Sequence, residues 1–170
     1  MDAAWERRIA EAWGEFDSYG EEEGAVFRGV IDALVSELPP RHPVGLFERA
    51  CAFDSTGHSD RAVPLYQEAL ERGLGGYDGY RRRRTAVQLA SSLRNVGRAQ
   101  EGVDLLAGEV GASSDELDDA VCACLALCLA DLGREREGLA LVLGALAPHL
   151  PRYQRSMARY ARALVADGQP

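Results

Sequence analysis

A glycine recurs at nearly constant spacing through most of the chain, and this recurrence constrains the fold more than any other feature. An alanine stands seven residues before each of these glycines and a large apolar residue stands four before. A small residue one turn ahead of a bulky one, followed by glycine, predicts a helix that packs closely and ends at that glycine. The glycines are Gly57, Gly97, Gly133 and Gly168, the alanines are Ala50, Ala90, Ala126 and Ala161, and the large residues are Phe53, Leu93, Leu129 and Leu164.

A second helical pattern follows each of the first three glycines. Its residues are offset by four and then by three, which places them on one stripe of a helix. The stripes are Ala62, Tyr66, Ala69 and Leu70, then Gly102, Leu106, Glu109 and Val110, then Gly138, Val142, Ala145 and Leu146. The repeating unit is therefore predicted to be a helical hairpin.

These residues resemble the tetratricopeptide repeat family, whose unit of about 34 residues is a helical hairpin with small and aromatic residues at fixed places. The best match is the unit 42–75, where the positions that mark the family are occupied by Ala50, Phe53, Gly57, Ala62, Tyr66 and Ala69. The other units are more degenerate. The resemblance covers residues 42–168 and implies a stack of hairpins.

The chain is accordingly expected to be an all-α, right-handed α-solenoid of antiparallel helical hairpins with capping helices. Residues 1–41 form an N-terminal capping hairpin, 42–150 three degenerate repeats, and 151–170 a C-terminal capping helix, with a loop at 73–79. Boundaries carry an error of about two to four residues. The nine predicted helices are 2–17, 21–38, 42–56, 59–73, 79–96, 98–110, 114–132, 134–147 and 151–166.

The resemblance also implies a binding groove, because the first helices of such hairpins line the concave side of the stack. The residues that fall on groove-facing positions and that we predict to bind a partner are Arg84, Gln88, Ser91, Asn95, Cys124, Arg159 and Arg162. In the first unit the same positions hold Phe47, Glu48, Cys51 and Asp54. An arginine fork suits a carboxylate ligand. The arginines can equally serve only to keep the surface soluble, since the run 81–84 spans every face of a helix.

The charge of the chain bears on its partners. The formal net charge is −8, all 19 basic residues are arginine, and no lysine is present. This balance disfavours nucleic acid, and the absence of lysine excludes a Schiff base or a Walker-type phosphate loop. Arginine-only usage is typical of a GC-rich bacterial genome. The charge is uneven, since residues 1–40 carry a net charge of −7 and residues 41–170 only −1.

Membrane, metal and catalytic functions are not expected. No window is apolar enough for a membrane span and the N-terminus lacks an apolar signal core, so a cytoplasmic protein is predicted. The histidines His42, His58 and His149 fall at separate predicted turns, and no metal, cofactor or catalytic motif is found. The four cysteines are expected to stay reduced, with Cys122 or Cys128 buried between helices.

Two non-catalytic functions remain. The first is an interaction module that binds an acidic and apolar peptide or partner segment in the groove. The second is homodimerisation through the N-terminal hairpin, where Trp5, Trp13, Phe16 and Phe27 are predicted either to fill the core or to form a sticky patch.

Overall fold

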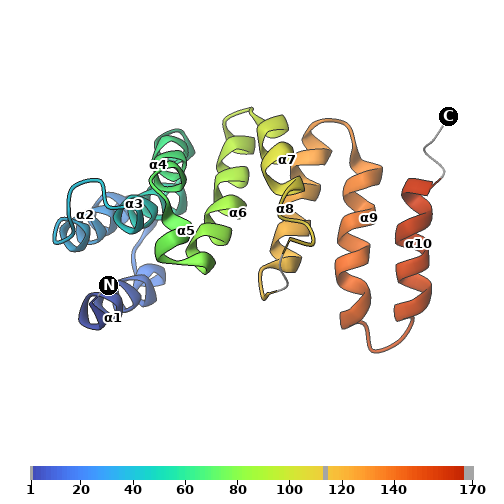
Figure 1. Ribbon diagram of the computed structural model, residues 1–170, viewed down its shortest axis with the longest axis horizontal. Helices are drawn as coiled ribbons and strands as arrows, with labels where there is room; N and C mark the ends of the chain where they lie inside the picture. Colours follow the sequence, from blue (N-terminus) through green and yellow to red (C-terminus); the bar gives the residue numbers. More distant parts are fainter. Residues whose placement is uncertain (1, 113–114, 167–170) are drawn as a thin grey trace. The chain divides into compact units, whose positions relative to one another are not determined.

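The computed structural model describes residues 2–112 and 115–166, and within them every regular element is a helix. The chain divides into two compact units, residues 1–85 and 86–170. The α-helices are α1 (Ala3–Gly14), α2 (Gly24–Val35), α3 (Pro43–Ser55), α4 (Ser59–Glu71), α5 (Leu74–Tyr77), α6 (Gly79–Asn95), α7 (Ala99–Ala107), α8 (Asp118–Asp131), α9 (Glu135–Leu146) and α10 (Gln154–Ala166) (Figure 1). Short 3-10 turns lie at Phe16–Ser18, Glu21–Glu23 and Ala147–His149.

The predicted all-helical fold of paired helices is confirmed, and the glycines end their helices as expected. Gly57, Gly97 and Gly133 have φ of 80°, 78° and 74°, a left-handed conformation that favours glycine. After each one, the next amide donates to the carbonyl five residues before it, as from His58 to Phe53 at 2.9 Å and from Arg98 to Leu93 at 2.8 Å. Gly168 lies outside the described residues.

The alanines of the repeat lie inside the molecule, as the register requires. Ala50 and Ala90 have no exposed surface, while Ala126 and Ala161 are 6% and 4% exposed. Opposite them, the second helices also carry small residues. A Cβ on Gly138 would lie 2.8 Å from the carbonyl oxygen of Ala126, so these two backbones pack closely because that side chain is missing.

One correction concerns the segment 73–79, which was predicted to be a loop but contains the one-turn helix α5. Gly73 adopts φ 79° and ends α4, and the fully buried side chain of Leu74 then fixes the following turn. This turn contains two glycines, and because glycine has a low helix propensity the sequence predicted a loop there. The described residues therefore contain ten α-helices where nine were expected. The predicted start of the helix at 114 lies outside the described residues, and α8 begins at Asp118.

The N-terminal unit is built around packed aromatic side chains. Trp5 and Phe27 are 3% and 0% exposed, and Trp13 and Phe16 are half-buried against Phe27, with ring centroids 5.0 and 4.7 Å away. The indole nitrogen of Trp13 donates to Glu48 Oε2 at 2.8 Å. These four aromatic residues therefore fill the interior of the hairpin, and the sticky patch that motivated the homodimer hypothesis is not formed by them.

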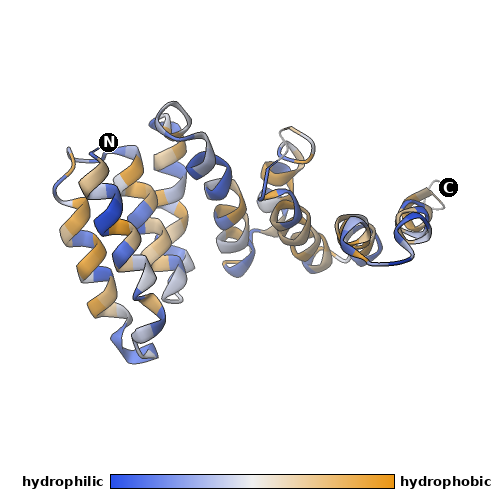
Figure 2. Cartoon of the chain, turned by 90° about the horizontal axis from the view of Figure 1, so that it is seen from below, coloured by the Kyte–Doolittle hydropathy of each residue, from blue (hydrophilic) through white to orange (hydrophobic). Residues whose placement is uncertain are grey.

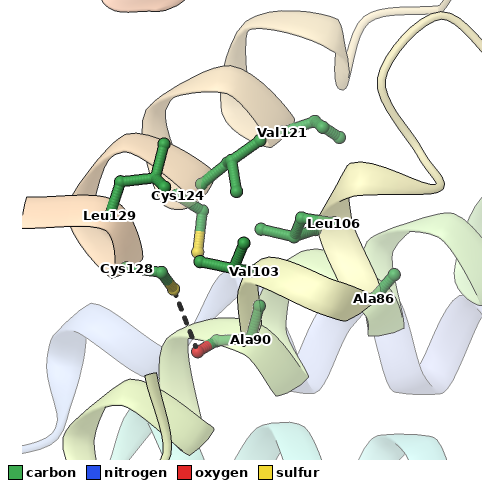
Figure 3. Close-up of a cluster of buried hydrophobic side chains, with 9 residues drawn as sticks. Ala86, Ala90, Val103, Leu106, Val121, Cys124, Cys128 and Leu129 are labelled. Atoms are coloured by element: carbon green, nitrogen blue, oxygen red, sulfur yellow. Dashed lines mark hydrogen bonds between the residues drawn. The ribbon is translucent and has the colours of Figure 1, made fainter. Parts of the chain in front are cut away.

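The C-terminal unit has its core between α6, α7 and α8. Val103 and Leu106 of α7 lie against Val121, Cys124 and Cys128 of α8, and the Cys128 thiol donates to the carbonyl of Ala90 on α6 at 3.7 Å (Figure 3). Further along the chain, α9 packs against α8, and α10 packs against α9 (Figure 1). Figure 2 shows hydrophilic and hydrophobic residues mixed along the helices, although α8 holds an unbroken apolar run at 120–130.

Candidate functional site

Four of the predicted groove residues follow one stripe of α6. Arg84, Gln88, Ser91 and Asn95 are spaced by four, three and four residues, which aligns them along one helical face. The first three are half-buried and Asn95 is exposed. The guanidinium of Arg84 lies 5.5 Å from the centre of the Phe47 ring, within the range of a cation–π contact. This stripe is partly accessible.

Cys124 and three of the four first-unit groove positions are core residues, while the fourth, Asp54, is half-buried. Cys124 is only 7% exposed, and its thiol donates to the carbonyl of Val87 at 3.4 Å, so it contributes to the packing of α8 on α6. Phe47, Glu48 and Cys51 are buried as well. In the family these positions face the groove, but in this chain neighbouring residues cover them.

Glu48 belongs to a buried charge network that the sequence did not reveal. It accepts a hydrogen bond from Arg81 Nε at 3.1 Å, and the same guanidinium bonds Glu6 at 2.7 Å and Asp78 at 3.0 Å. Burial raises the pKa of Glu48, although Arg81 and Trp13 favour its charged form. Burial lowers the pKa of Arg81, but the hydrogen bonds that Arg81 donates to Glu6 and the charges of the surrounding carboxylates more than reverse this and raise the pKa. The network joins α1, α3 and α6 within the N-terminal unit.

The C-terminal unit contains an apolar cavity of about 680 Å³, which we call the α9–α10 cavity. Most of its lining side chains are aliphatic, and many are as small as alanine or glycine. They are Val103 and Ala107 of α7, Cys122, Leu125 and Leu129 of α8, Ala140, Leu141, Gly144 and Ala145 of α9, and Ala158, Ala161 and Val165 of α10, with Arg134, Glu137 and Arg162 among them. The volume falls within the range of roughly 300–1,000 Å³ that is usual for ligand sites.

The charged side chains of the cavity differ in their partners. Arg134 forms an ion pair with Glu137, with Nε and Oε1 2.7 Å apart, and this hydrogen bond lowers the pKa of Glu137. Arg162 has no ion pair within the described residues. Neighbouring Arg159 lies over the ring of Tyr160, with the guanidinium 5.3 Å from its centre. The cavity therefore joins an apolar interior to a cation that is available to a ligand.

The aliphatic residues of the cavity were not assigned to a site from the sequence, because each of them looked like an ordinary packing residue. The signal that could have found them is the series of small residues on neighbouring helices, Ala140, Gly144 and Ala158. Side chains of this size leave space wherever two helices do not approach closely. No local motif marks such a space.

Beside the cavity, α9 has an apolar face whose equivalents in the earlier repeats are covered. Val142 is 39% exposed, although Tyr66 and Leu106, which occupy the same place in α4 and α7, are fully buried. Leu139 and Leu146 are exposed on the same face. The residue of α10 that corresponds to Cys124 of α8 is Arg159, which is charged and exposed. Helix α10 therefore does not pack on α9 in the way that α8 packs on α7.

Other chemistry finds little support in the described ranges 2–112 and 115–166. They contain no group of three histidine, cysteine or acidic side chains that could hold a metal ion. His149 and Asp119 form an exposed pair, with Nε2 and Oδ2 2.8 Å apart. No helix in these ranges is both long and apolar enough to cross a membrane.

Comparison with known proteins agrees with this architecture. A family model described as a tetratrico peptide repeat matches residues 43–164, which is more than half of the chain. The chain belongs to the tetratricopeptide repeat family. Members of this family are in general protein–protein interaction modules and typically non-catalytic scaffolds. Comparison with curated proteins and with solved structures finds no match.

Proposed function

We propose that this tetratricopeptide repeat protein is a non-catalytic interaction module that binds a partner segment carrying apolar and acidic side chains in the α9–α10 cavity. The observation that carries this proposal is the apolar cavity of about 680 Å³ with Arg162 at its edge. In this scheme residues 1–41 cap the N-terminal end, residues 42–150 are the repeats, and residues 151–170 are the C-terminal cap, whose helix α10 supplies one wall of the site.

The chemistry of the cavity sets what the partner must offer. Burying apolar surface against its aliphatic lining gains about 25 cal/mol for each Å² removed from water, so a partner segment with aliphatic side chains is favoured. The guanidinium of Arg162 can hold a carboxylate with two parallel hydrogen bonds. A segment with an apolar anchor and an acidic neighbour therefore uses both features at once.

The stripe Arg84, Gln88, Ser91 and Asn95 along α6 is retained as a separate contact surface that we propose for a partner. These polar side chains lie along α6 and are partly accessible. Amide and hydroxyl groups in such a row can bond the backbone of an extended segment. Cys124 is left out of the proposed contact surface because it is buried.

The test fills the cavity and removes its cation in separate variants. The residue Gly144 is exposed, and an added Cβ there meets no atom within 4 Å, so Gly144→Leu should fit the fold while occupying the cavity. The probe is a fluorescent helical peptide of leucine and glutamate residues, and its anisotropy reports binding. Both Gly144→Leu and Arg162→Ala are expected to weaken binding by about tenfold or more.

Matched controls are Gly14→Leu and Arg7→Ala, which change an exposed glycine and an exposed arginine in the N-terminal unit. They should leave binding unchanged. If Gly144→Leu binds the peptide as tightly as the unaltered protein while retaining its helical circular dichroism, the cavity is not the binding site.

The homodimer through the N-terminal aromatic residues is not carried forward as a second function. Trp5 and Phe27 are buried, and Trp13 and Phe16 pack against Phe27. No observation on these four side chains favours that interface.

A further inference from the structure

We propose that the segment bound in the α9–α10 cavity belongs to a second copy of this chain, namely the exposed face of α2 together with the acidic turn Glu21–Glu23 that precedes it. This inference rests on the proposed function, since it uses the same cavity and names the partner. Three observations carry it, and they concern the charge of α10, the charge of the N-terminal hairpin, and the exposed apolar residues at each place.

The segment that contains α10 carries a high density of positive charge. Residues 150–166 contain four arginines and no acidic residue. Within the described residues none of the four forms an ion pair, whereas arginines on other helices, such as Arg94 and Arg134, have carboxylate partners. The four are Arg152, Arg155, Arg159 and Arg162. A surface of this kind attracts an acidic segment.

The N-terminal hairpin carries the opposite charge. Residues 1–40 hold ten acidic residues and three arginines, and only Glu6, Asp32 and Glu37 are ion-paired in the described part of the chain. Five of the seven others crowd the connection between α1 and α2. The seven are Asp2, Glu11, Glu15, Asp17, Glu21, Glu22 and Glu23. The charges of the two segments are therefore complementary.

The apolar features match as well. Val26 is 59% exposed and is the only exposed large apolar side chain in the described residues 2–76. It lies one turn after Glu22 and Glu23, so one helical face presents the apolar anchor and the carboxylates together. Ala25, Gly29 and Ala33 surround it and are exposed.

Small residues on both partners allow their helices to approach closely. The cavity side offers Ala140, Gly144 and Ala158, and α2 offers Ala25 and Gly29. The chain already uses this kind of contact internally, where Gly138 lies against the backbone of Ala126. Val26 is thus placed to enter the cavity while Glu22 and Glu23 reach the arginines of α10.

Each copy offers an α2 face and a cavity, so two copies can pair these surfaces reciprocally in a closed dimer, or each surface can take a different neighbour and further copies add. In both cases the expected signature is a mass above that of the monomer that increases with concentration, and a monomer at every concentration contradicts the proposal.

The experiment measures mass by sedimentation velocity on the full chain over a wide concentration series. Variant A is Arg155→Glu/Arg159→Glu/Arg162→Glu, and variant B is Glu21→Arg/Glu22→Arg/Glu23→Arg. Each alone should be monomeric, because its contact brings like charges together. Mixing A with B should restore assembly, since each reversed segment then meets a complementary one. The substitution Val26→Ser in the unaltered background should weaken assembly by about tenfold.

A charge-matched control is Asp60→Arg/Glu71→Arg/Glu116→Arg, which reverses exposed acidic residues outside the hairpin and should leave the assembly intact. A monomer at every concentration, or no rescue in the A and B mixture with helicity retained, overturns the inference. The leucine and glutamate peptide separates the two proposals. If the protein binds the peptide in a Gly144-dependent manner yet stays monomeric, the proposed function stands and the self-association fails. If it does neither, both fail.

Discussion

At the scale of single residues, two glycines decide how closely the paired helices of the second unit pack. A Cβ on Gly102 would lie 2.8 Å from the Cys128 sulfur and 3.1 Å from the Ala90 carbonyl oxygen, and one on Gly138 would lie 2.8 Å from the Ala126 carbonyl oxygen. Alanine gains up to about 1 kcal/mol in helix propensity, but overpacking against backbone costs about 1–3 kcal/mol. We therefore expect Gly138→Ala to lower the free energy of unfolding, measured by urea denaturation.

The control for this prediction is a helical glycine with open space around it. At Gly29 and Gly144 an added Cβ meets no atom within 4 Å, so Gly29→Ala and Gly144→Ala should raise the free energy of unfolding by about 0.5–1 kcal/mol. Gly138→Ala proteins as stable as these controls would show that the α8 and α9 backbones are not in close contact.

The buried carboxylate of Glu48 gives a second residue-scale prediction, on pH dependence. Its pKa is raised by burial in the folded state, so the folded protein holds this proton more tightly than the unfolded chain. Stability contributed by that proton is present below the unfolded pKa and is lost as the pH rises toward the folded pKa. Glu48→Gln should therefore remove this decline, while Gln still offers an oxygen to Trp13.

The measurement is the free energy of unfolding of both proteins across the acidic range. The unaltered protein should lose stability relative to Glu48→Gln as the pH increases from the ordinary glutamate pKa upward. Exposed Glu71→Gln controls for the loss of one charge. Parallel profiles for the unaltered protein and Glu48→Gln would contradict a raised pKa.

At the scale of helices, α8 places three of the four cysteines in different environments. Cys124 and Cys128 face the core beside α6, while Cys122 is half-buried and lines the α9–α10 cavity. Cys51 is fully buried in α3, and none of the four cysteines forms a disulfide bond. The burial of Cys128 confirms the expectation that Cys122 or Cys128 lies between helices.

We expect one thiol, Cys122, to react with an aromatic disulfide reagent in the native protein and all four to react after denaturation. Peptide bound in the cavity should slow that single reaction, because it covers the sulfur. A Cys122→Ala variant, which should show no fast reaction, identifies the thiol. Fast native reaction of Cys124 or Cys128 would contradict the packing of α8 on α6.

Helix positions could be predicted from the sequence because the repeat register makes the same demand several times. Each unit needs a glycine that can adopt positive φ and an alanine small enough to pack against another backbone. The same two residue types therefore recur at the same spacing in each unit. The cavity could not be predicted, since it depends on how far α10 stands from the helices before it. Glu48 and Cys124 were assigned to an open groove because family positions were carried over, whereas Arg81 and Val87 of this chain close over them.

At the scale of the whole molecule, burial is distributed unevenly among the helices. Nine residues of α3 are buried, whereas in α10 only Ala161 is. Regions with few buried contacts open locally at a lower free energy than the core. We therefore expect the amide hydrogens of α10 to exchange fastest among the long helices and those of α3 to exchange slowest, as measured by hydrogen exchange with mass spectrometry at a dilution where the protein is monomeric.

Occupation of the cavity should change this pattern in a specific way. A ligand that binds only the folded α9–α10 arrangement stabilises it against opening, so exchange in α9 and α10 should slow while exchange in α3 and α4 stays the same. Raising the protein concentration should have the same effect on α9 and α10, and should also slow exchange in α2, if the second copy is the ligand. Gly144→Leu should abolish both responses, because the leucine then occupies the space. Equal protection of α10 and α3 in the dilute protein would mean that the C-terminal helix is held by contacts that the cavity does not provide.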